Sequence, residues 1–234
     1  MKVFAISDLH LSINNPKPMD IFGPAWDNYI DNIIKNWNDV VTDDDIVLIP
    51  GDISWAMKFE EAKPDLDLIC ALKGKKIILK GNHDYWWSSI SEVREYLHNE
   101  TYALQNNAYK FGNVIVCGSR GWTIPDNGVR TEQDEKIYRR ELIRMELSLK
   151  SMEAQKQQGD ICIVTTHFPP FNYRIEDSEM TALFEKYGVN YVVFGHLHSF
   201  DKKQKMTMNK NGVCYYLTSC DLTGNQLVEI TNVK

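Results

Sequence analysis

Short runs of apolar residues recur along the chain, and each is bounded by polar residues, glycine or proline. They are rich in valine and isoleucine, which favour extended backbone. Runs of this length between polar boundaries are typical of strands that are buried on both faces. The predicted strands cover residues 2–7, 45–50, 75–80, 113–117, 160–166 and 190–195.

Between these runs, apolar residues recur at the spacing of three and four that is typical of an amphipathic helix. Ser88 and Ser89 stand before one such segment as candidate N-caps. Pro64 is expected to divide residues 58–73 into two helical pieces, because proline cannot donate to the preceding turn. Strands that alternate with helices predict an α/β layered domain with mostly parallel central strands. The remaining predicted helices cover residues 26–37, 88–98, 130–158 and 177–187.

The predicted helix over residues 130–158 carries an apolar stripe at spacings of four and three. This stripe predicts a helix that buries one face against a sheet. Its members are Tyr138, Leu142, Met145, Leu149 and Met152. The arginines of the same segment are expected to form a solvated face, namely Arg139, Arg140 and Arg144.

The last part of the chain has a different pattern, with extended segments at residues 202–210, 212–218 and 226–230 joined by turns that contain glycine. We expect these segments to form a second, more antiparallel sheet that packs on the first. No internal repeat, low-complexity segment or linker interrupts the sequence, so a single domain over residues 1–234 is predicted.

Composition narrows the class of protein. Of the 234 residues, 43% are hydrophobic and 25% charged, which is ordinary for a globular protein. The net charge of −6 argues against nucleic-acid binding through a broad basic surface. Five scattered cysteines without a C-x-x-C pair indicate reduced, buried thiols. No stretch approaches the ~20 apolar residues of a membrane span, and a cytoplasmic protein without such a span is expected.

Several of the predicted strands end on side chains that bind metals. The motifs are Asp8-Leu9-His10, Gly51-Asp52, Gly81-Asn82-His83-Asp84, His167 and Gly195-His196-Leu197-His198. Ligands of open α/β sheets bind beyond the carboxyl ends of the strands, so these motifs should converge at one edge. Any one of them alone would more often be a surface pair, a cap or a turn. All of the histidines except His98 follow this pattern, however, and together they predict a metal site.

The spacing of the ligands suggests how the backbone presents them. In extended backbone, residues two apart point the same way, so both ligands of D-x-H and H-x-H would face the site. Leu9 and Leu197 would then face the core. Glycines at 51, 81 and 195 would allow sharp turns and close approach to an ion.

Taken in order, D-x-H, G-D, G-N-H-D, H and G-H-x-H resemble the motifs of the calcineurin-like metallophosphoesterases. The resemblance implies a two-sheet β-sandwich flanked by helices, a four-layer α/β/β/α arrangement. It also implies a pair of metal ions with Asp52 as the bridge between them. One ion would be held by Asp8, His10, Asp52 and His198, and the other by Asp52, Asn82, His167 and His196.

The ligand types favour Mn or Fe, with Zn or Ni as alternatives, over Ca or Cu(I). The resemblance implies hydrolysis of a phosphomonoester or phosphodiester through attack by a hydroxide that bridges the metals. His83 would contact the phosphate and protonate the leaving group, and Asp84 would fix the orientation of the His83 ring.

The substrate class stays open between several alternatives. The Ser-Asp-Leu-His-Leu opening also resembles lipid A pyrophosphatases, but these have arginine where this chain has His83. A nuclease is disfavoured by the acidic charge balance, and a non-catalytic scaffold is disfavoured because no ligand position is lost. Aromatic residues crowd the loops after the ligands, and Arg120 and Trp122 are predicted to bind a small phosphorylated substrate. The sequence makes no prediction of oligomeric state.

Overall fold

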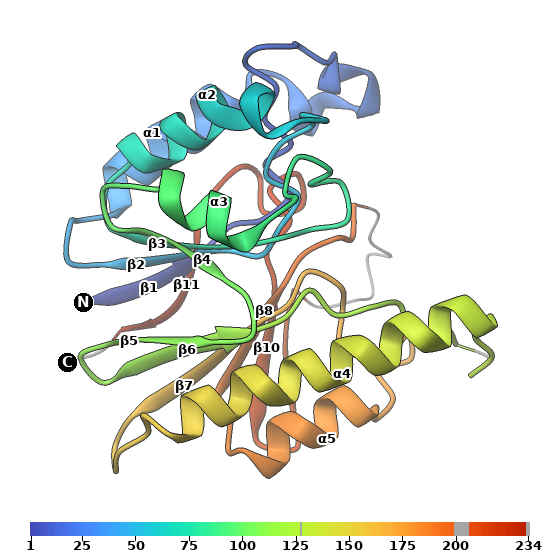
Figure 1. The fold of residues 1–234 in the computed structure, drawn as a ribbon. Coiled ribbons are helices and arrows are strands. Elements are labelled where there is room, and N and C mark those ends of the chain that lie inside the picture. Colours follow the sequence, from blue (N-terminus) through green and yellow to red (C-terminus); the bar gives the residue numbers. More distant parts are fainter. Residues whose placement is uncertain (127, 199–205, 233–234) are drawn as a thin grey trace.

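The computed structural model describes residues 1–126, 128–198 and 206–232, and it arranges their strands in two sheets (Figure 1). The first sheet has five strands in the order β11-β1-β2-β3-β4, and the second has six in the order β5-β6-β7-β8-β10-β9. The first sheet consists of β1 (Lys2–Ala5), β2 (Ile46–Ile49), β3 (Lys75–Leu79), β4 (Thr101–Leu104) and β11 (Val228–Asn232). The second consists of β5 (Ala108–Phe111), β6 (Val114–Gly118), β7 (Ile161–Thr165), β8 (Tyr191–Phe194), β9 (Thr207–Lys210) and β10 (Val213–Leu217).

The central strands of both sheets are parallel, as the sequence predicts. β1 to β4 run parallel to one another, as do β6, β7, β8 and β10. The edge strands β11, β5 and β9 pair antiparallel with their neighbours. The strands β4 and β5 are short and were not predicted.

Side chains that alternate along each strand divide the core into layers. On β2, Val47 and Ile49 belong to an apolar cluster with the helices, whereas Ile46 and Leu48 belong to a cluster between the two sheets. Both faces of the strand are therefore buried, which explains its uninterrupted apolar sequence. In Figure 1, α1, α2 and α3 lie over the first sheet and α4 and α5 over the second. The four-layer α/β/β/α prediction is confirmed.

The helices follow the predicted segments with shifted ends. They are α1 (Tyr29–Val40), α2 (Phe59–Ala71), α3 (Ile90–Tyr96), α4 (Glu132–Glu153) and α5 (Glu179–Lys186). α1 starts later than predicted, because Met19–Phe22 and Pro24–Trp26 form two 3₁₀ turns before it. The apolar stripe of α4 packs in the core cluster of the second sheet, as expected. Within the described residues, no helix combines the length and apolar composition of a membrane span.

The prediction that Pro64 divides its segment is wrong. α2 runs through Pro64 as one helix. The lost hydrogen bond would have ended on the carbonyl of Glu60 in the first turn of the helix. Glu60 is exposed, so the loss is mild.

The prediction that the last segments form a second sheet is right only in part. β9 and β10 extend the second sheet, where β10 pairs parallel with β8, while β11 joins the first sheet beside β1. Local turn signals could not show which existing edge each strand would join. Residues 202–205 of the predicted extended segment lie outside the described residues.

Candidate metal centre

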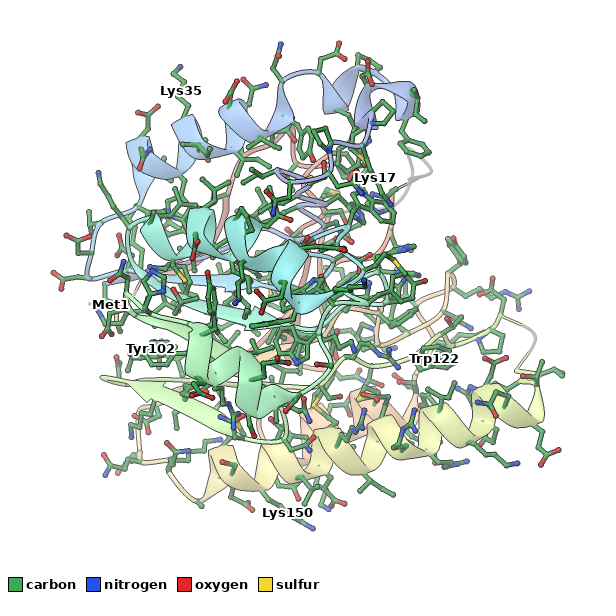
Figure 2. All side chains as sticks on the ribbon, turned by 45° about the horizontal axis from the view of Figure 1, so that its top comes forward. Met1, Lys17, Lys35, Tyr102, Trp122 and Lys150 are labelled. Carbon is green, nitrogen blue, oxygen red and sulfur yellow. The ribbon has the colours of Figure 1, made fainter. Side chains whose placement is uncertain are left out.

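The predicted ligands come from loops that each begin where a parallel strand ends. β1, β2 and β3 of the first sheet precede some of them, and β7 and β8 of the second precede the others. Figure 2 shows Lys17 and Trp122, from loops at this edge, on the side of the molecule opposite Met1. The structure brings together all of the predicted ligands, namely Asp8, His10, Asp52, Asn82, His167, His196 and His198.

The backbone of the D-x-H motif is not extended, in contrast to the prediction. β1 ends before the motif, and Asp8 and His10 have φ angles of 58° and 45°. Asp52 and His196 are left-handed as well, at 52° and 72°. Such a conformation costs a non-glycine residue about 1–3 kcal/mol, and it persists only where the surroundings enforce it. Turns beyond the strands therefore orient these ligands, not the two-residue alternation of extended backbone.

Asp8, His10 and His198 form one group of metal-binding atoms. The Nε2 atoms of His10 and His198 are 3.4 Å apart, and His198 Nε2 lies 3.7 Å from Asp8 Oδ1. One atom from each residue lies within 4.8 Å of the others, so a single ion could contact all three.

Asn82, His167 and His196 form a second group. Asn82 Oδ1 lies 2.6 Å from His167 Nε2 and 2.9 Å from His196 Nδ1. His167 Nδ1 donates to the carbonyl of Pro50 at 2.9 Å, so the neutral ring presents a lone pair at Nε2. Burial holds the pKa of His167 well below its usual value, which keeps the ring neutral. Asn82 Oδ1 and His167 Nε2 are both acceptors at this short distance, and a cation bound to both would offset their repulsion.

Asp52 lies between the two groups. Its Oδ1 is 3.5 Å from His167 Nε2 and its Oδ2 is 3.9 Å from His10 Nε2. Oδ2 is buried and has no hydrogen-bond partner among the described residues. A buried carboxylate oxygen without a partner is costly, so the site is incomplete without a positive charge.

The pKa values of the buried groups also indicate that the site needs positive charge. Burial raises the pKa of Asp8 to about 6. Burial, with the charges of Asp84 and Asp8, raises the pKa of Asp52 to about 9. Burial also lowers the pKa of His10 to about 2 and that of His196 to about 4, so these imidazoles bring no balancing charge. Divalent cations would supply that charge, and the donor set of carboxylate, imidazole and amide fits them.

Several residues that support the ligands were missed in the sequence. The hydroxyl groups of Ser7 and Ser219 donate to Asp8 Oδ2 at 2.5 and 3.0 Å, which leaves Oδ1 for the site. His198 Nδ1 donates to Asp221 Oδ1 at 3.1 Å, an arrangement that orients metal-binding histidines. Asp221 follows the end of β10 by a few residues, so the strand-end rule could have found it.

The glycines lie where the backbone passes close to the predicted ligands, and their close approach to an ion stays a prediction. A Cβ atom on Gly51, which has φ of +91°, would lie 2.7 Å from the Cα of Gly81 and 2.8 Å from His167 Nδ1. A Cβ on Gly81 would overlap the carboxylate of Asp52, and one on Gly195 would overlap that of Asp8. Any side chain at these positions would displace a ligand.

His83 lies beside the two groups. Its backbone N–H donates to Asp52 Oδ1 at 2.8 Å, and its ring centroid is 4.7 Å from that of Trp55 and 5.7 Å from that of His10. The ring is half-buried, and burial lowers its pKa, with His198 and Lys17 acting in the same direction.

Asp84 has a different set of contacts from the one predicted. Its carboxylate is fully buried and accepts from the backbone N–H groups of Ile53, Ser54 and Gly81 and from Trp86 Nε1. None of its hydrogen bonds among the described residues comes from the His83 ring. Asp84 therefore ties the loop after β2 to the loop after β3, and would position His83 only through the backbone.

Arg120 and Trp122 lie beyond β6, away from the carboxylates. The Arg120 guanidinium lies 4.9 Å from the Trp122 ring, and Trp122 Nε1 donates to Asp134 Oδ1 at 3.1 Å. The Trp122 ring contacts Phe168, whose centroid lies 4.2 Å from that of His196. Trp122 thus reaches the ligand groups through Phe168, whereas the backbone carbonyl of Arg120 accepts a hydrogen bond from the N–H of His167 at 3.0 Å.

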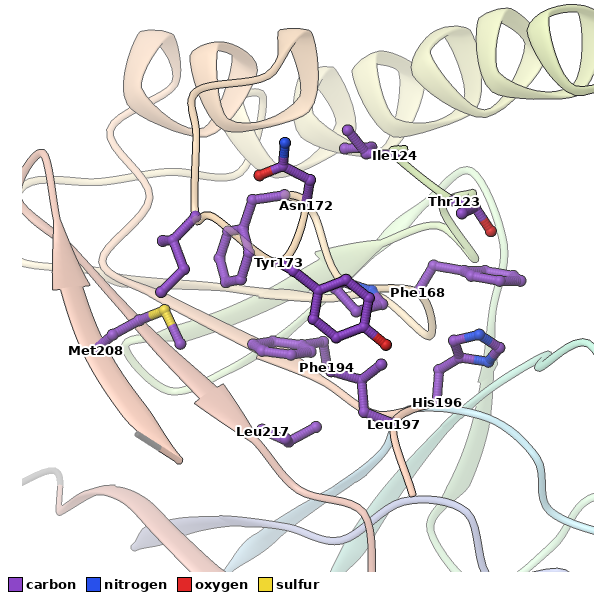
Figure 3. Close-up of a pocket in the computed structure, with 13 residues that line it drawn as sticks. Thr123, Ile124, Phe168, Asn172, Tyr173, Phe194, His196, Leu197, Met208 and Leu217 are labelled. Carbon is purple, nitrogen blue, oxygen red and sulfur yellow. The ribbon is translucent and has the colours of Figure 1, made fainter. Parts of the chain in front are cut away.

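An apolar cavity of about 140 Å³ opens beside His196, and we call it the apolar slot. Figure 3 shows His196 and Phe168 at one end and Met208 at the other. Its walls include Phe171, Phe194, Leu197, Leu217, Ile124, Tyr173 and Ile175. No aspartate, glutamate, lysine or arginine is among its described lining residues.

The chain is similar to proteins of a known family. The family model described as calcineurin-like phosphoesterase matches residues 1–200. An uncharacterized protein of Methanocaldococcus jannaschii is 32% identical over 47% of this chain, and the match spans 56% of that relative's length. A probable cyclic nucleotide phosphodiesterase of Coxiella burnetii is 23% identical over 93% of this chain and 85% of its own.

Solved structures share the fold. The phosphopantetheinyl hydrolase of Mycobacterium tuberculosis matches with a TM-score of 0.59 and 14% identity, covering 99% of this chain and 96% of its own. A protein of Thermus thermophilus matches with a TM-score of 0.61 and 15% identity, covering 99% of this chain and 98% of its own.

Proposed function

Since the chain belongs to the calcineurin-like phosphoesterase family, we propose that it is a metal-dependent phosphohydrolase that uses two divalent ions to hydrolyse a phosphomonoester or phosphodiester. The position of Asp52 between two groups of donor atoms carries this proposal. One carboxylate that reaches both groups is the arrangement that a pair of neighbouring ions requires. Mn or Fe is expected, with Zn or Ni as alternatives.

Each ion would be held by residues of both sheets. Asp8, His10, Asp52 and His198 would hold one, and Asp52, Asn82, His167 and His196 the other. When bound, such ions act as Lewis acids toward the phosphoryl oxygens and lower the pKa of a water molecule that attacks phosphorus.

His83 would donate the proton that the leaving oxygen takes. Its ring is not needed for either donor group, and it lies on the loop that also carries Asn82 and Asp84. The hydrogen bond from its backbone N–H to Asp52 holds the loop that carries the ring beside the metal-binding atoms. A group in that position suits general acid catalysis.

The apolar slot supports an organic ester group as part of the substrate. Its volume of about 140 Å³ is close to the ~150 Å³ of an engineered apolar cavity that binds benzene. One ring or a short alkyl group would fit, whereas two acyl chains would not, which disfavours the lipid-sugar pyrophosphatase alternative. The names of the relatives from Coxiella burnetii and Mycobacterium tuberculosis, a phosphodiesterase and a hydrolase, agree with an organic phosphate.

Turnover of 4-nitrophenyl phosphate and its bis ester with added Mn²⁺ tests the proposed reaction. We expect hydrolysis of at least one of them, its loss with a chelator, and its return with metal. An enzyme that takes up no metal, or whose activity a chelator leaves unchanged, would refute the proposal. A protein that binds metal but hydrolyses nothing in a panel of nucleotides and phospholipids would favour the scaffold alternative.

The slot has its own test. Met208→Trp places a large side chain at the end of the slot that is remote from His196. We expect it to lower kcat/KM for phenyl phosphate by about 10-fold while leaving that for methyl phosphate unchanged. Equal effects on both esters would show that the ester group binds elsewhere.

A further inference from the structure

A second cavity, of about 290 Å³, is lined in part by residues that flank the loop carrying Asn82, and we call it the basic cavity. It is lined by the cationic side chains of Lys80, Arg120, Arg140 and Arg144. Glu141 is the one carboxylate among its described lining residues. Polar groups of Ser88, Gln105, Asn106 and Ser119 complete much of the wall.

The basic cavity shares backbone with the metal centre. Lys80 directly precedes Gly81 and Asn82 in the chain. The carbonyl of Arg120 accepts hydrogen bonds from the backbone N–H groups of His167 and Phe168, both at 3.0 Å. The cavity is therefore a neighbour of the metal centre, although none of the predicted ligands lines it.

The charges around the basic cavity do not balance. Glu141 Oε1 lies 2.7 Å from Arg144 Nη1 and 4.0 Å from Arg120 Nη2, so this single carboxylate serves two arginines. Lys80 Nζ donates to the carbonyl of Trp87 at 2.5 Å, and Arg140 has no ion pair among the described residues.

The neighbouring Arg139, on the same helix, differs from Arg140 because carboxylates pair with its charge. It pairs with Glu135 at 2.6 Å and with Glu179 at 2.5 Å on the outer surface. Arg139 and Arg140 are both exposed, as predicted for this face of α4, and Arg144 is half-buried. Arg140 and Arg144, four residues apart on one face, also line the cavity.

We propose that the basic cavity binds a phosphate-type oxyanion, separate from the phosphoryl group that reacts at the metal centre. Guanidinium groups recognise such oxyanions through paired N–H donors, and an oxyanion would relieve the repulsion among the cations. Two sources share this chemistry: a second anionic group on the substrate, and free inorganic phosphate. The first source rests on the proposed phosphohydrolase function, and the second does not.

Titration of the metal-loaded enzyme with inorganic phosphate, followed by calorimetry, tests the site. We expect two phosphate sites in the wild type, one at the metals and one in the basic cavity. Arg140→Ala should weaken the cavity site by about 10-fold or more, whereas Arg139→Ala should retain both sites. A single site in the wild type, or equal behaviour of the two variants, would overturn the proposal.

Inhibition of 4-nitrophenyl phosphate hydrolysis distinguishes the two sources. If the cavity takes a second group of the substrate, fructose 1,6-bisphosphate should inhibit the wild type about 10-fold more strongly than fructose 6-phosphate. Arg140→Ala should abolish that difference. Equal inhibition by the two sugars, together with loss of the second phosphate site in Arg140→Ala, would assign the cavity to free phosphate.

A second variant distinguishes loss of the binding site from loss of stability. Arg144→Gln also reaches the cavity, but it removes a partner of the buried Glu141 and should lower the melting temperature. Arg140 has no such partner in the part of the chain that the structure describes, so Arg140→Ala should melt near the wild-type temperature. Because hydrolysis of 4-nitrophenyl phosphate reports on the metal centre itself, its persistence in Arg140→Ala would separate failure of this site from failure of the proposed function.

Discussion

The two sheets contribute differently to the candidate metal centre. The loops of the first sheet supply both carboxylates and the amide, and Asp8 and Asp52 are almost completely buried. The loops of the second sheet supply only imidazoles, and the side chain of His198 is 37% exposed. The first sheet thus supplies the negative charge of the site, and the second supplies imidazoles alone.

The two sets of ligands also differ in part in how they are held in place. Asp8, His10 and Asp52 of the first sheet have left-handed backbone, as does His196 of the second. His167 and His198 are oriented by hydrogen bonds at Nδ1, to Pro50 and Asp221. We infer that loss of a first-sheet carboxylate removes the reason for metal to bind, whereas loss of a second-sheet imidazole weakens one contact.

Asp52→Asn should have the largest effect and tests this contrast directly. The variant loses the negative charge that lies between the two donor groups, so we expect loss of both ions and a fall in turnover of about 10⁴-fold or more. His198→Gln, at the exposed side of the site, should retain at least one ion. Metal analysis of the purified variants and rates with 4-nitrophenyl phosphate measure both. Equal loss of metal in the two variants would contradict the division between the sheets.

His83→Ala sharpens the comparison, because His83 lies on a first-sheet loop but is not expected to bind metal. Metal content should stay near the wild-type value, while turnover falls by about 10²–10⁴-fold. The defect should shrink for esters with good leaving groups, which need little protonation. Loss of metal in this variant would instead place His83 among the ligands.

Asp221→Asn probes the support of a second-sheet ligand. We expect metal affinity to fall by about 10–100-fold, the usual effect of removing a partner of a metal-binding histidine. Asp177→Asn, whose carboxylate pairs with Lys210 at the surface, is the matched control and should bind metal normally. Competition with a fluorescent chelator measures the affinities, and an unchanged affinity in Asp221→Asn would refute the role.

The pH dependence of metal binding separates the carboxylates from the imidazoles. In the protein without metal, the pKa of Asp52 is raised to about 9, so a proton occupies it at neutral pH and must leave when metal binds. Affinity should therefore rise with pH between about 6 and 9, by up to ~10-fold per pH unit for each proton released. Calorimetry in buffers of different ionisation enthalpy counts those protons. Affinity that changes only below pH 6.5 would indicate titration of histidines instead.

Trp122→Ala should have the smallest effect. Its ring contacts Phe168 and not the ligands, so metal content should be normal and KM for the true substrate should rise by about 2–10-fold. Hydrolysis of a minimal aryl phosphate should be spared. Tyr102→Ala, at the other end of the molecule (Figure 2), serves as control, and equal effects of the two changes would remove Trp122 from the binding site.

Much of the fold could be predicted because its signals are local. Strands such as β2 are buried on both faces, which leaves an unbroken apolar run in the sequence. The motifs at the strand ends were sufficient for the family, because a parallel sheet brings its carboxyl ends to one edge. The extent of the domain and the metal-binding role of each residue stay predictions.

The features that were missed depend on long-range contacts. β4 and β5 are short and carry polar residues such as Thr101 and Lys110, so only their pairing partners define them. The left-handed turns at Asp8 and His10 are imposed by contacts with the loop after β2. The sequence could not show that Arg139 forms ion pairs and Arg140 lines a cavity, because the two residues are identical and adjacent. The difference arises from the segments that pack against each side of α4.

The left-handed backbone at His10 and His196 has an evolutionary consequence. Glycine would adopt these conformations without the cost of about 1–3 kcal/mol that other residues bear. Selection for the candidate site therefore retains histidines where glycine would make the backbone more stable. A descendant released from selection for hydrolysis would be expected to drift toward glycine or asparagine at these two positions first. Such replacements would mark members that keep the fold and have given up the chemistry, and their higher melting temperatures would record the strain that selection had maintained.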